Sequence, residues 1–250
     1  DALVPARRAW RGPGPGPGWG TRRALACAVI LMLAGTCGAP PRAATAVDEQ
    51  RVDTTGGALL ARLRAGGLVL YFRHAATDWS QSDRVERAGD WRSCDPQRMR
   101  QLSAQGRADA IRVGEAMRTL AIPVHRVYAS PYCRTVQTAE LLGLGAPEQT
   151  ADVMNLRVAE HFGGRAAIVT RARRLIGRMP EPDSPRARAN VVIVAHGNVA
   201  REATPAYPGE AESLVLRPLG NARFELLGRL TPDAWQRLAE QYPAETGTAR

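Results

Sequence analysis

The sequence contains no lysine, and all 34 of its basic side chains are arginine. This absence excludes Schiff-base chemistry, which needs a lysine amine, and the Walker-type nucleotide loop, which needs a lysine ammonium. Arginine offers instead a planar fork of donors that matches the oxygen atoms of a phosphate group. The basic residues therefore favour a phosphate-containing ligand.

Cysteine is also scarce, with four residues in 250. Cys27 and Cys37 lie in an N-terminal segment that we expect to be removed, which leaves Cys94 and Cys133. In an oxidising compartment these two can form a disulfide or remain as separate buried thiols, and their spacing alone does not decide between the two states.

Residues 1–46 have the composition of an export signal. Basic residues precede a short apolar run at 24–34, and the small residues at 44–46 fit a cleavage site. We expect a signal peptide over 1–46 and a mature protein in the periplasm or outside the cell. A retained N-terminal anchor stays open, and the arginine pair at 22–23 leaves the choice between general and twin-arginine export open.

Residues 47–250 are enough for a single catalytic domain with a full core. The whole chain has a net charge of +10; residues 1–46 contain six arginines and one aspartate, or +5, which leaves +5 for the rest. That charge is too mild to indicate nucleic-acid binding. We expect no membrane span in the mature form, and the oligomeric state stays open.

Two apolar runs with the pattern of buried parallel strands each end on a histidine. Residues 68–72 follow two glycines and lead into Arg73 and His74, and residues 190–195 lead into His196. Ligands of open α/β sheets bind outside the carboxyl ends of the strands. Both histidines are therefore candidates for a functional site.

A third predicted strand, at 124–129, runs into a polar turn and then a helix over 136–142. Arg134 lies near the start of that helix, where its charge opposes the helix dipole at a cost of roughly 0.3–1 kcal/mol. The placement makes physical sense if an anion binds there. His125, inside the strand, is interpreted as structural.

The rest of the chain predicts further alternation of helices and strands. We expect helices over 48–64, from the Ser103 cap through Leu120, after Gly164 and over 231–242; strands over 213–217 and 224–229; and loops over 79–99 and 143–152. Loops as long as the one at 79–99 often cover functional sites.

Three motifs, in order, resemble the histidine phosphatase superfamily, the phosphoglycerate mutase-like acid phosphatases. They are Arg-His at 73–74, Ser-Pro-x-x-Arg-Thr-x-x-Thr-Ala at 130–139, and Ala-His-Gly at 195–197. The resemblance implies a three-layer α/β sandwich with a mainly parallel central sheet flanked by helices, and no metal or organic cofactor. One departure is Ala75, where the family has a glycine that can adopt positive φ at lower cost.

The resemblance also implies roles for individual residues. His74 would be the nucleophile that takes up the phosphoryl group, and Arg73, Arg134 and His196 would surround its non-bridging oxygens. Thr77 and Asn198, which follow the two histidines in the chain, are further candidates for substrate contact. The expected function is hydrolysis of a small phosphorylated compound through a phosphohistidine intermediate.

The general acid is the least constrained role. Glu160 lies in the segment 156–164, which approximates the family pattern Leu-x-x-Glu-x-x-x-Gly. Asp78, Glu210 and Glu212 stay open as alternatives. The acid would protonate the leaving alkoxide and then activate the water that hydrolyses the phosphohistidine.

Two other functions stay open. A domain with the same pocket but no competent acid would bind phosphate without catalysis. A metallohydrolase using His74, His196 and Asp78 is disfavoured, because the sequence has no His-x-His or His-Glu-x-x-His spacing.

The resemblance also bears on the cysteines. It places Cys133 in the arginine turn and Cys94 in the loop that would cover the same pocket, so we expect a disulfide that ties the loop to the site.

Overall fold

The computed structural model describes residues 56–180 and 188–243. The predicted signal segment and the first eight residues of the predicted helix at 48–64 lie outside these ranges. The helices are α1 (Gly56–Ala65), α2 (Ala104–Thr119), α3 (Cys133–Leu142), α4 (Arg165–Ile176), α5 (Gly197–Ala203) and α6 (Pro232–Gln241), with 3₁₀ helices η1 (Asp90–Arg92), η2 (Ala151–Val153) and η3 (Leu156–Phe162). The strands are β1 (Val69–Arg73), β2 (Val124–Ala129), β3 (Pro147–Gln149), β4 (Asn190–Ala195), β5 (Ser213–Pro218) and β6 (Phe224–Leu230).

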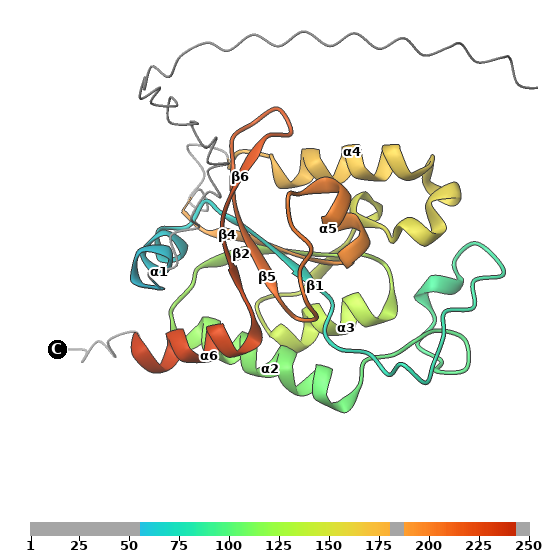
Figure 1. Cartoon of the computed structure of the whole chain (residues 1–250), viewed down its shortest axis with the longest axis horizontal. Coiled ribbons are helices and arrows are strands. Elements are labelled where there is room, and N and C mark those ends of the chain that lie inside the picture. Colours follow the sequence, from blue (N-terminus) through green and yellow to red (C-terminus); the bar gives the residue numbers. More distant parts are fainter. Residues whose placement is uncertain (1–55, 181–187, 244–250) are drawn as a thin grey trace, which may run out of the picture. The chain divides into compact units, whose positions relative to one another are not determined.

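The strands form one six-stranded sheet in the order β3-β2-β4-β1-β5-β6 (Figure 1). The neighbours β3, β2, β4 and β1 are parallel, whereas β5 and β6 add to β1 as antiparallel strands. The prediction of a mainly parallel central sheet is therefore confirmed. The central strands β1 and β4 are covered on both faces, which explains their continuous apolar sequence.

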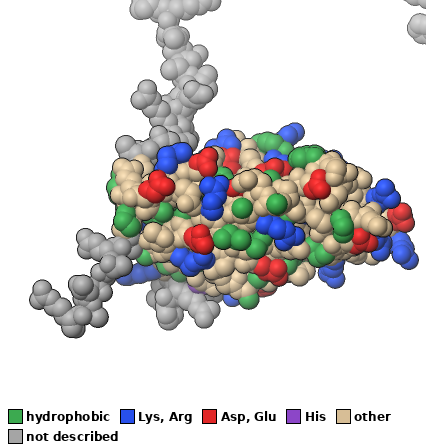
Figure 2. All heavy atoms as spheres, turned by 90° about the horizontal axis from the view of Figure 1, so that it is seen from below, with side chains coloured by type: hydrophobic (Ala, Val, Ile, Leu, Met, Phe, Trp, Pro, Cys, Tyr) green, Lys and Arg blue, Asp and Glu red, His purple; other side chains and the backbone are tan. Residues whose placement is uncertain are grey.

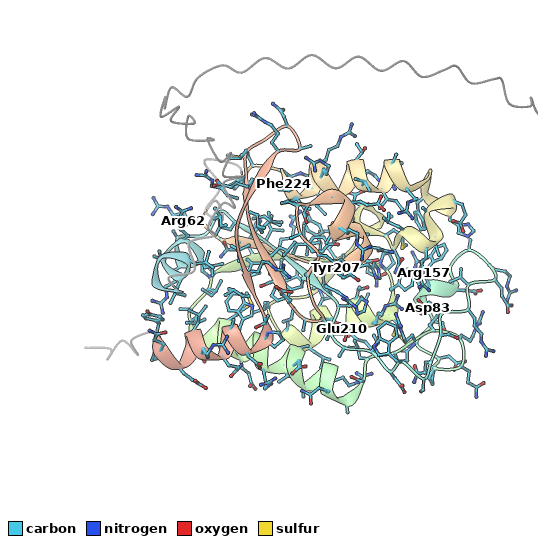
Figure 3. All side chains as sticks on the ribbon, in the orientation of Figure 1. Arg62, Asp83, Arg157, Tyr207, Glu210 and Phe224 are labelled. Carbon is cyan, nitrogen blue, oxygen red and sulfur yellow. A yellow bond between two sulfur atoms is a disulfide. The ribbon has the colours of Figure 1, made fainter. Side chains whose placement is uncertain are left out.

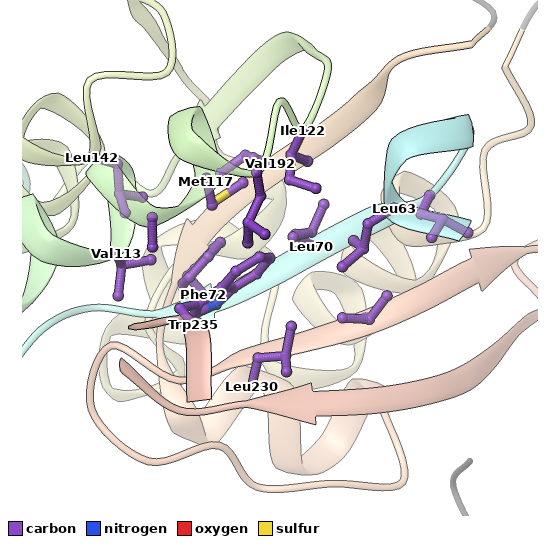
Figure 4. Close-up of a cluster of buried hydrophobic side chains, with 14 of the residues drawn as sticks. Leu63, Leu70, Phe72, Val113, Met117, Ile122, Leu142, Val192, Leu230 and Trp235 are labelled. Carbon is purple, nitrogen blue, oxygen red and sulfur yellow. The ribbon is translucent and has the colours of Figure 1, made fainter. Parts of the chain in front are cut away.

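Side chains of β1 alternate between two hydrophobic clusters, one on each face of the sheet. Leu70 and Phe72 pack with residues of α1, α2, α3 and α6, including Met117 and Trp235 (Figure 4). Val69 and Tyr71 pack on the other face, against α4, α5, η2 and η3. Helices on both faces of one sheet make the predicted three layers.

Among the strands and α-helices, two short elements were not predicted. Strand β3 has three residues and pairs with β2 at the edge of the sheet, and its sequence, Pro-Glu-Gln, has no strand pattern. Helix α5 has only seven residues and follows His196 directly. Helix α3 starts three residues earlier than expected, which places Arg134 inside its first turn.

The predicted disulfide is present between Cys94 and Cys133, with the two Cα atoms 5.4 Å apart. It ties the 79–99 loop to the first residue of α3. The same loop contributes Trp91, whose ring contacts the rings of His161 and Phe162 in η3. A disulfide that closes a loop of this length stabilises the folded state by roughly 3–4 kcal/mol in the chain-entropy model. The loop is therefore anchored beside Arg134.

The surface shown in Figure 2 carries arginine side chains interspersed with Asp and Glu, without a continuous patch of one sign. In the part of the chain that the structure describes, no helix combines the length and the apolar character that crossing a membrane requires.

Candidate active site

The two predicted histidines meet because their strands are neighbours in register. Arg73, the last residue of β1, pairs with Ala195, the last residue of β4, so His74 and His196 leave the sheet side by side. Their ring centroids lie 5.6 Å apart, and both side chains are buried. The carboxyl edge of the sheet thus brings together two residues 122 positions apart in the sequence.

His74 is held in one tautomer. Its Nδ1 lies 2.9 Å from the carbonyl oxygen of Ala75, and a carbonyl can only accept a hydrogen bond, so Nδ1 carries the proton. Burial lowers the pKa of His74 well below its usual 6.5, and the charge of Arg134 lowers it further. The imidazole is therefore neutral, with the lone pair on Nε2, which is the form a nucleophile needs.

Ala75 fits its position without backbone strain. Among the described non-glycine residues with positive φ, Ala75 is absent, so the replacement of the family's glycine costs nothing in backbone conformation here. Its backbone N–H donates to Thr138 Oγ1, which in turn donates to the carbonyl oxygen of Arg134. The nucleophile loop is thereby tied to α3.

His196 is also fixed on both ring nitrogens. The Asn155 side chain accepts from the backbone N–H of Arg157 and from Asn198 Nδ2, so its own amide nitrogen faces His196 Nδ1 at 3.1 Å. Nδ1 must then accept, and Nε2 carries the proton toward Ser130 Oγ at 2.9 Å. Burial and the charge of Arg134 lower the pKa of His196 as well. Both candidate histidines are therefore neutral.

These lowered pKa values predict a pH-dependent stability. An unfolded histidine takes up a proton near pH 6.5, whereas His74 and His196 in the fold do not. The free energy of unfolding is therefore at its full value above pH 6.5 and falls as the pH drops, by up to about 1.4 kcal/mol per pH unit for each histidine. Urea denaturation at pH 7.5 and 5.5 measures this. His74→Asn should lose less stability over that interval; an unchanged dependence would contradict the prediction.

Arg73 lies on the β5 side of the site. Its Nη2 donates to Glu210 Oε1 at 3.3 Å, its Nη1 donates to the Pro208 carbonyl oxygen at 3.4 Å, and its guanidinium lies 5.5 Å from the centre of the Tyr207 ring. A Cβ on Gly197 would lie 2.7 Å from that ring, so the glycine of the Ala-His-Gly motif permits this packing. Glu210, a rival candidate for the acid, therefore lies in the site.

Arg134 lies on the opposite side and is nearly completely buried, with 2% of its side chain exposed. Its Nη1 and Nη2 donate to the two carboxylate oxygens of Asp83, at 2.9 and 3.0 Å. Its guanidinium stacks on Tyr132, 4.6 Å from the ring centre. Arg100 is a third cation here: its charge acts on both histidines, and its guanidinium stacks 4.0 Å from the centre of the exposed Trp79 ring.

The carboxylate candidates differ in their surroundings. Glu160 is 69% exposed and lies 3.6 Å from His161 Nε2. Glu212 is buried in an ion pair with Arg229. Asp78 is half-buried and accepts hydrogen bonds from the Ser80 side chain and backbone, which lower its pKa. Glu212 and Asp78 therefore serve local structure, and Glu160 and Glu210 remain as candidate acids.

The two predicted substrate contacts have free hydrogen-bonding capacity in the described structure. Thr77 Oγ1 and Asn198 Oδ1 are buried and have no hydrogen-bond partner among the described residues. Asn198 uses its Nδ2 to hold Asn155. A bound ligand could satisfy both oxygen-bearing groups.

Sequence reasoning missed several residues of the site, above all Asp83, Arg100, Asn155 and Tyr207. Figure 3 shows Tyr207 and Glu210 on one side of this edge and Asp83 and Arg157 on the other. All of them lie in loops or in η3, and loop residues have no periodicity from which an orientation can be inferred. For Asp83 alone the sequence offered a signal, because the 79–99 loop is long and polar.

Among the described residues, no group of three His, Cys, Asp or Glu side chains could hold a metal ion. The trio of the metallohydrolase alternative does not come together, because Asp78 accepts hydrogen bonds within its own turn, from Ser80 and Gln81. His125 lines a separate cavity of about 430 Å³ that includes Gly67 and Ala189, the residues before β1 and β4. That cavity is at the amino-terminal edge of the sheet, away from His74.

Comparisons with known proteins agree with the motifs. Residues 69–163 match the family model of the histidine phosphatase superfamily, branch 1. No curated protein gave a significant match.

Solved structures similar to this chain include the protein histidine phosphatase SixA complexed with tungstate (14% identity, 66% of this chain and 97% of that chain, TM-score 0.47). Another is a mycobacterial glucosyl-3-phosphoglycerate phosphatase (16%, 64% and 96%, 0.45). A third is a putative α-ribazole-5′-P phosphatase from Escherichia coli (14%, 64% and 95%, 0.45). Because these TM-scores are below 0.5, the similarity to the histidine phosphatase superfamily rests on the family model and the three motifs.

Proposed function

We propose that this chain, whose residues 69–163 match the family model of the histidine phosphatase superfamily, hydrolyses phosphomonoesters of small compounds through a phosphohistidine intermediate. The observation that carries the proposal is the state of His74. It is buried, neutral and fixed with its proton on Nδ1, and arginine side chains lie on both sides of it. This combination suits attack on a phosphate ester by Nε2.

The reaction has two steps. In the first, Nε2 of His74 forms a bond to phosphorus while the phosphorus–oxygen bond of the ester breaks, and the leaving oxygen takes a proton from the general acid. In the second, the same acid, now a carboxylate, takes a proton from a water molecule that attacks phosphorus. The nitrogen–phosphorus bond breaks, inorganic phosphate leaves, and His74 returns to its starting state.

Three cations would stabilise the phosphoryl group. The charges of Arg134, Arg73 and Arg100 all act on His74, and against them stand the carboxylates of Asp83 and Glu210. The net positive charge of these groups attracts a phosphate ester, whose negative charge spreads over the non-bridging oxygens in the transition state. His196, with its Nε2 proton directed at Ser130, would need to exchange that partner to donate to a phosphoryl oxygen.

The general acid in this proposal is Glu160. Its charge acts on Tyr132, although burial is the main cause that raises the pKa of that phenol. Tyr132 in turn contacts His196, with ring centroids 4.7 Å apart. Glu210 is the alternative, but its Oε1 already accepts a hydrogen bond from Arg73 Nη2, at 3.3 Å.

A phosphate-binding domain without catalysis is the second candidate. It is favoured by the high exposure of Glu160 and by the hydrogen bonding of His74, to which no described carboxylate is hydrogen-bonded.

Export to an oxidising compartment remains part of the proposal, and the Cys94–Cys133 disulfide supports it.

Incubating the purified protein with a panel of phosphomonoesters tests this function. We expect release of inorganic phosphate, no loss of rate on addition of a metal chelator, and a labelled protein whose phosphate is stable in alkali and lost in acid. Phosphate binding without any release would favour the second candidate. Inactivation by the chelator would contradict both.

A further inference from the structure

Asp83 forms a bidentate ion pair with the Nη1 and Nη2 atoms of Arg134. The two carboxylate oxygens accept from Nη1 and Nη2 at 2.9 and 3.0 Å, and 7% of the Asp83 side chain is exposed. Asp83 Oδ1 also accepts from the backbone N–H of Arg100, at 3.1 Å. The carboxylate is thus fixed by a buried, two-pronged contact from the 79–99 loop.

The hydrogen-bond donors of Arg134 can be counted. A guanidinium has five N–H groups. Nη1 uses one on Asp83 and the other on the carbonyl oxygen of Arg100, at 3.5 Å, and Nη2 uses one on Asp83. The Nε–H and the second Nη2–H remain. They lie on the same side of the planar group and form a second fork, and Nε is buried without a partner among the described residues.

This second fork belongs to the site. Arg134 stacks on Tyr132, whose ring meets the edge of His196. Among the charged side chains, Arg134 has the largest effect on the pKa of His74 and of His196. A buried donor pair next to two neutral imidazoles needs an acceptor with two oxygens, as a phosphoryl group has.

We propose that Asp83 is a positioning residue that holds Arg134 by its end, so that Nε and Nη2 face the phosphoryl group. The inference rests on the proposed function, because it assigns the second fork to that substrate. Asp83 itself does not touch the substrate. The 79–99 loop, fixed by the Cys94–Cys133 disulfide, thereby shapes the anion site from outside it.

A competing role for Asp83 predicts the opposite change in phosphate affinity. If Asp83 occupied the fork that phosphate needs, the carboxylate would compete with the substrate, and its removal would strengthen phosphate binding. In the positioning role, Asp83→Asn weakens binding, because an amide accepts one hydrogen bond from Arg134 and turns an N–H toward the other Nη. The orientation of the second fork is then lost.

Calorimetric titration of the whole chain with inorganic phosphate distinguishes these roles. We expect the Kd of Asp83→Asn to rise about ten- to a hundredfold, which corresponds to one or two charge-assisted hydrogen bonds. Asp83→Glu, which keeps the charge, should recover part of the affinity. Asp90→Asn is the matched control, because Asp90 lies in the same loop and grips Arg98 at 2.8 Å outside the site.

Asp83→Asn leaves a buried arginine unpaired, so its fold must be checked by thermal unfolding. If that variant does not fold, the test uses Asp83→Glu in two backgrounds, the natural chain and a chain that already carries Arg134→Lys. Lysine has no planar fork for Asp83 to orient. Asp83→Glu should therefore weaken phosphate binding in the natural chain and change it little in the Arg134→Lys background. Equal losses in both backgrounds would overturn the proposal.

Unchanged or tighter phosphate binding by folded Asp83→Asn would also overturn it, as would an equal loss in Asp90→Asn. The measurement does not need turnover. If the natural chain releases no phosphate from esters but Asp83→Asn still loses affinity for phosphate, the proposed function fails and the positioning role stands.

Discussion

Replacing His74 by alanine or asparagine should abolish turnover and phosphoenzyme formation, with kcat lower by roughly 10³-fold or more. The reason is that the lone pair of neutral His74 lies on Nε2, which has no hydrogen-bond donor among the described residues, whereas the lone pair of His196, on Nδ1, accepts from Asn155. Asparagine is the sharper variant, because its amide can keep the hydrogen bond to the Ala75 carbonyl oxygen while removing the attacking nitrogen. Turnover and trapping of the labelled intermediate measure the effect.

The fold should survive this change. His74 lies at the end of β1 and not within either hydrophobic cluster, so we expect the free energy of unfolding of His74→Asn to fall by less than about 2 kcal/mol. His125→Asn is the control, because this histidine lies at the opposite edge of the sheet. Appreciable turnover by folded His74→Asn would show that another group is the nucleophile.

Replacing Glu160 by glutamine should reduce the rate on an alkyl phosphate by roughly 10²-fold or more and leave much of the rate on p-nitrophenyl phosphate. An alkoxide leaves slowly unless it is protonated, whereas nitrophenolate leaves without a proton. The ratio of kcat/KM for the two esters, measured on the variant and on the natural chain, isolates proton donation from substrate binding.

Glu210→Gln, Glu212→Gln and Asp78→Asn are the controls for this experiment. Glu210→Gln should lower kcat/KM for both esters by the same factor, because it disturbs the contact with Arg73. Glu212→Gln and Asp78→Asn should also affect both esters alike, because these carboxylates hold local structure. If Glu210→Gln shows the dependence on the leaving group instead, the general acid comes from the loop before β5. Glu160, which is 69% exposed, is then not the acid.

Much of the site could be predicted because buried parallel strands have a clear sequence pattern. The runs at 68–72 and 190–195 are continuous and apolar, and each gives way to polar residues at its end, so Arg73, His74 and His196 were identified with the correct edge of the sheet. The pairing of β1 with β4 in the structure confirms that the two histidines meet.

The arginine turn was identified for a different reason. Arg134 attracted notice because a cation in the first turn of a helix is unfavourable without an anion. The structure supplies an anion from within the chain, Asp83, 51 residues away. The same physical argument that indicated a phosphate site could not distinguish a ligand from a carboxylate of the protein.

The sequence by itself determined the fold class, the two histidines, the two arginines and the disulfide, because each depends on a local pattern or on a resemblance carried by short motifs. Only the tertiary structure decided which proton each histidine carries, which way Arg134 faces and which carboxylates are committed to structural contacts. Those properties depend on single hydrogen bonds between loops, such as Asn155 with His196 and Asp83 with Arg134. A hydrogen bond needs its two atoms within about 3 Å, and for residues far apart in the sequence only the packing of the whole chain fixes that distance.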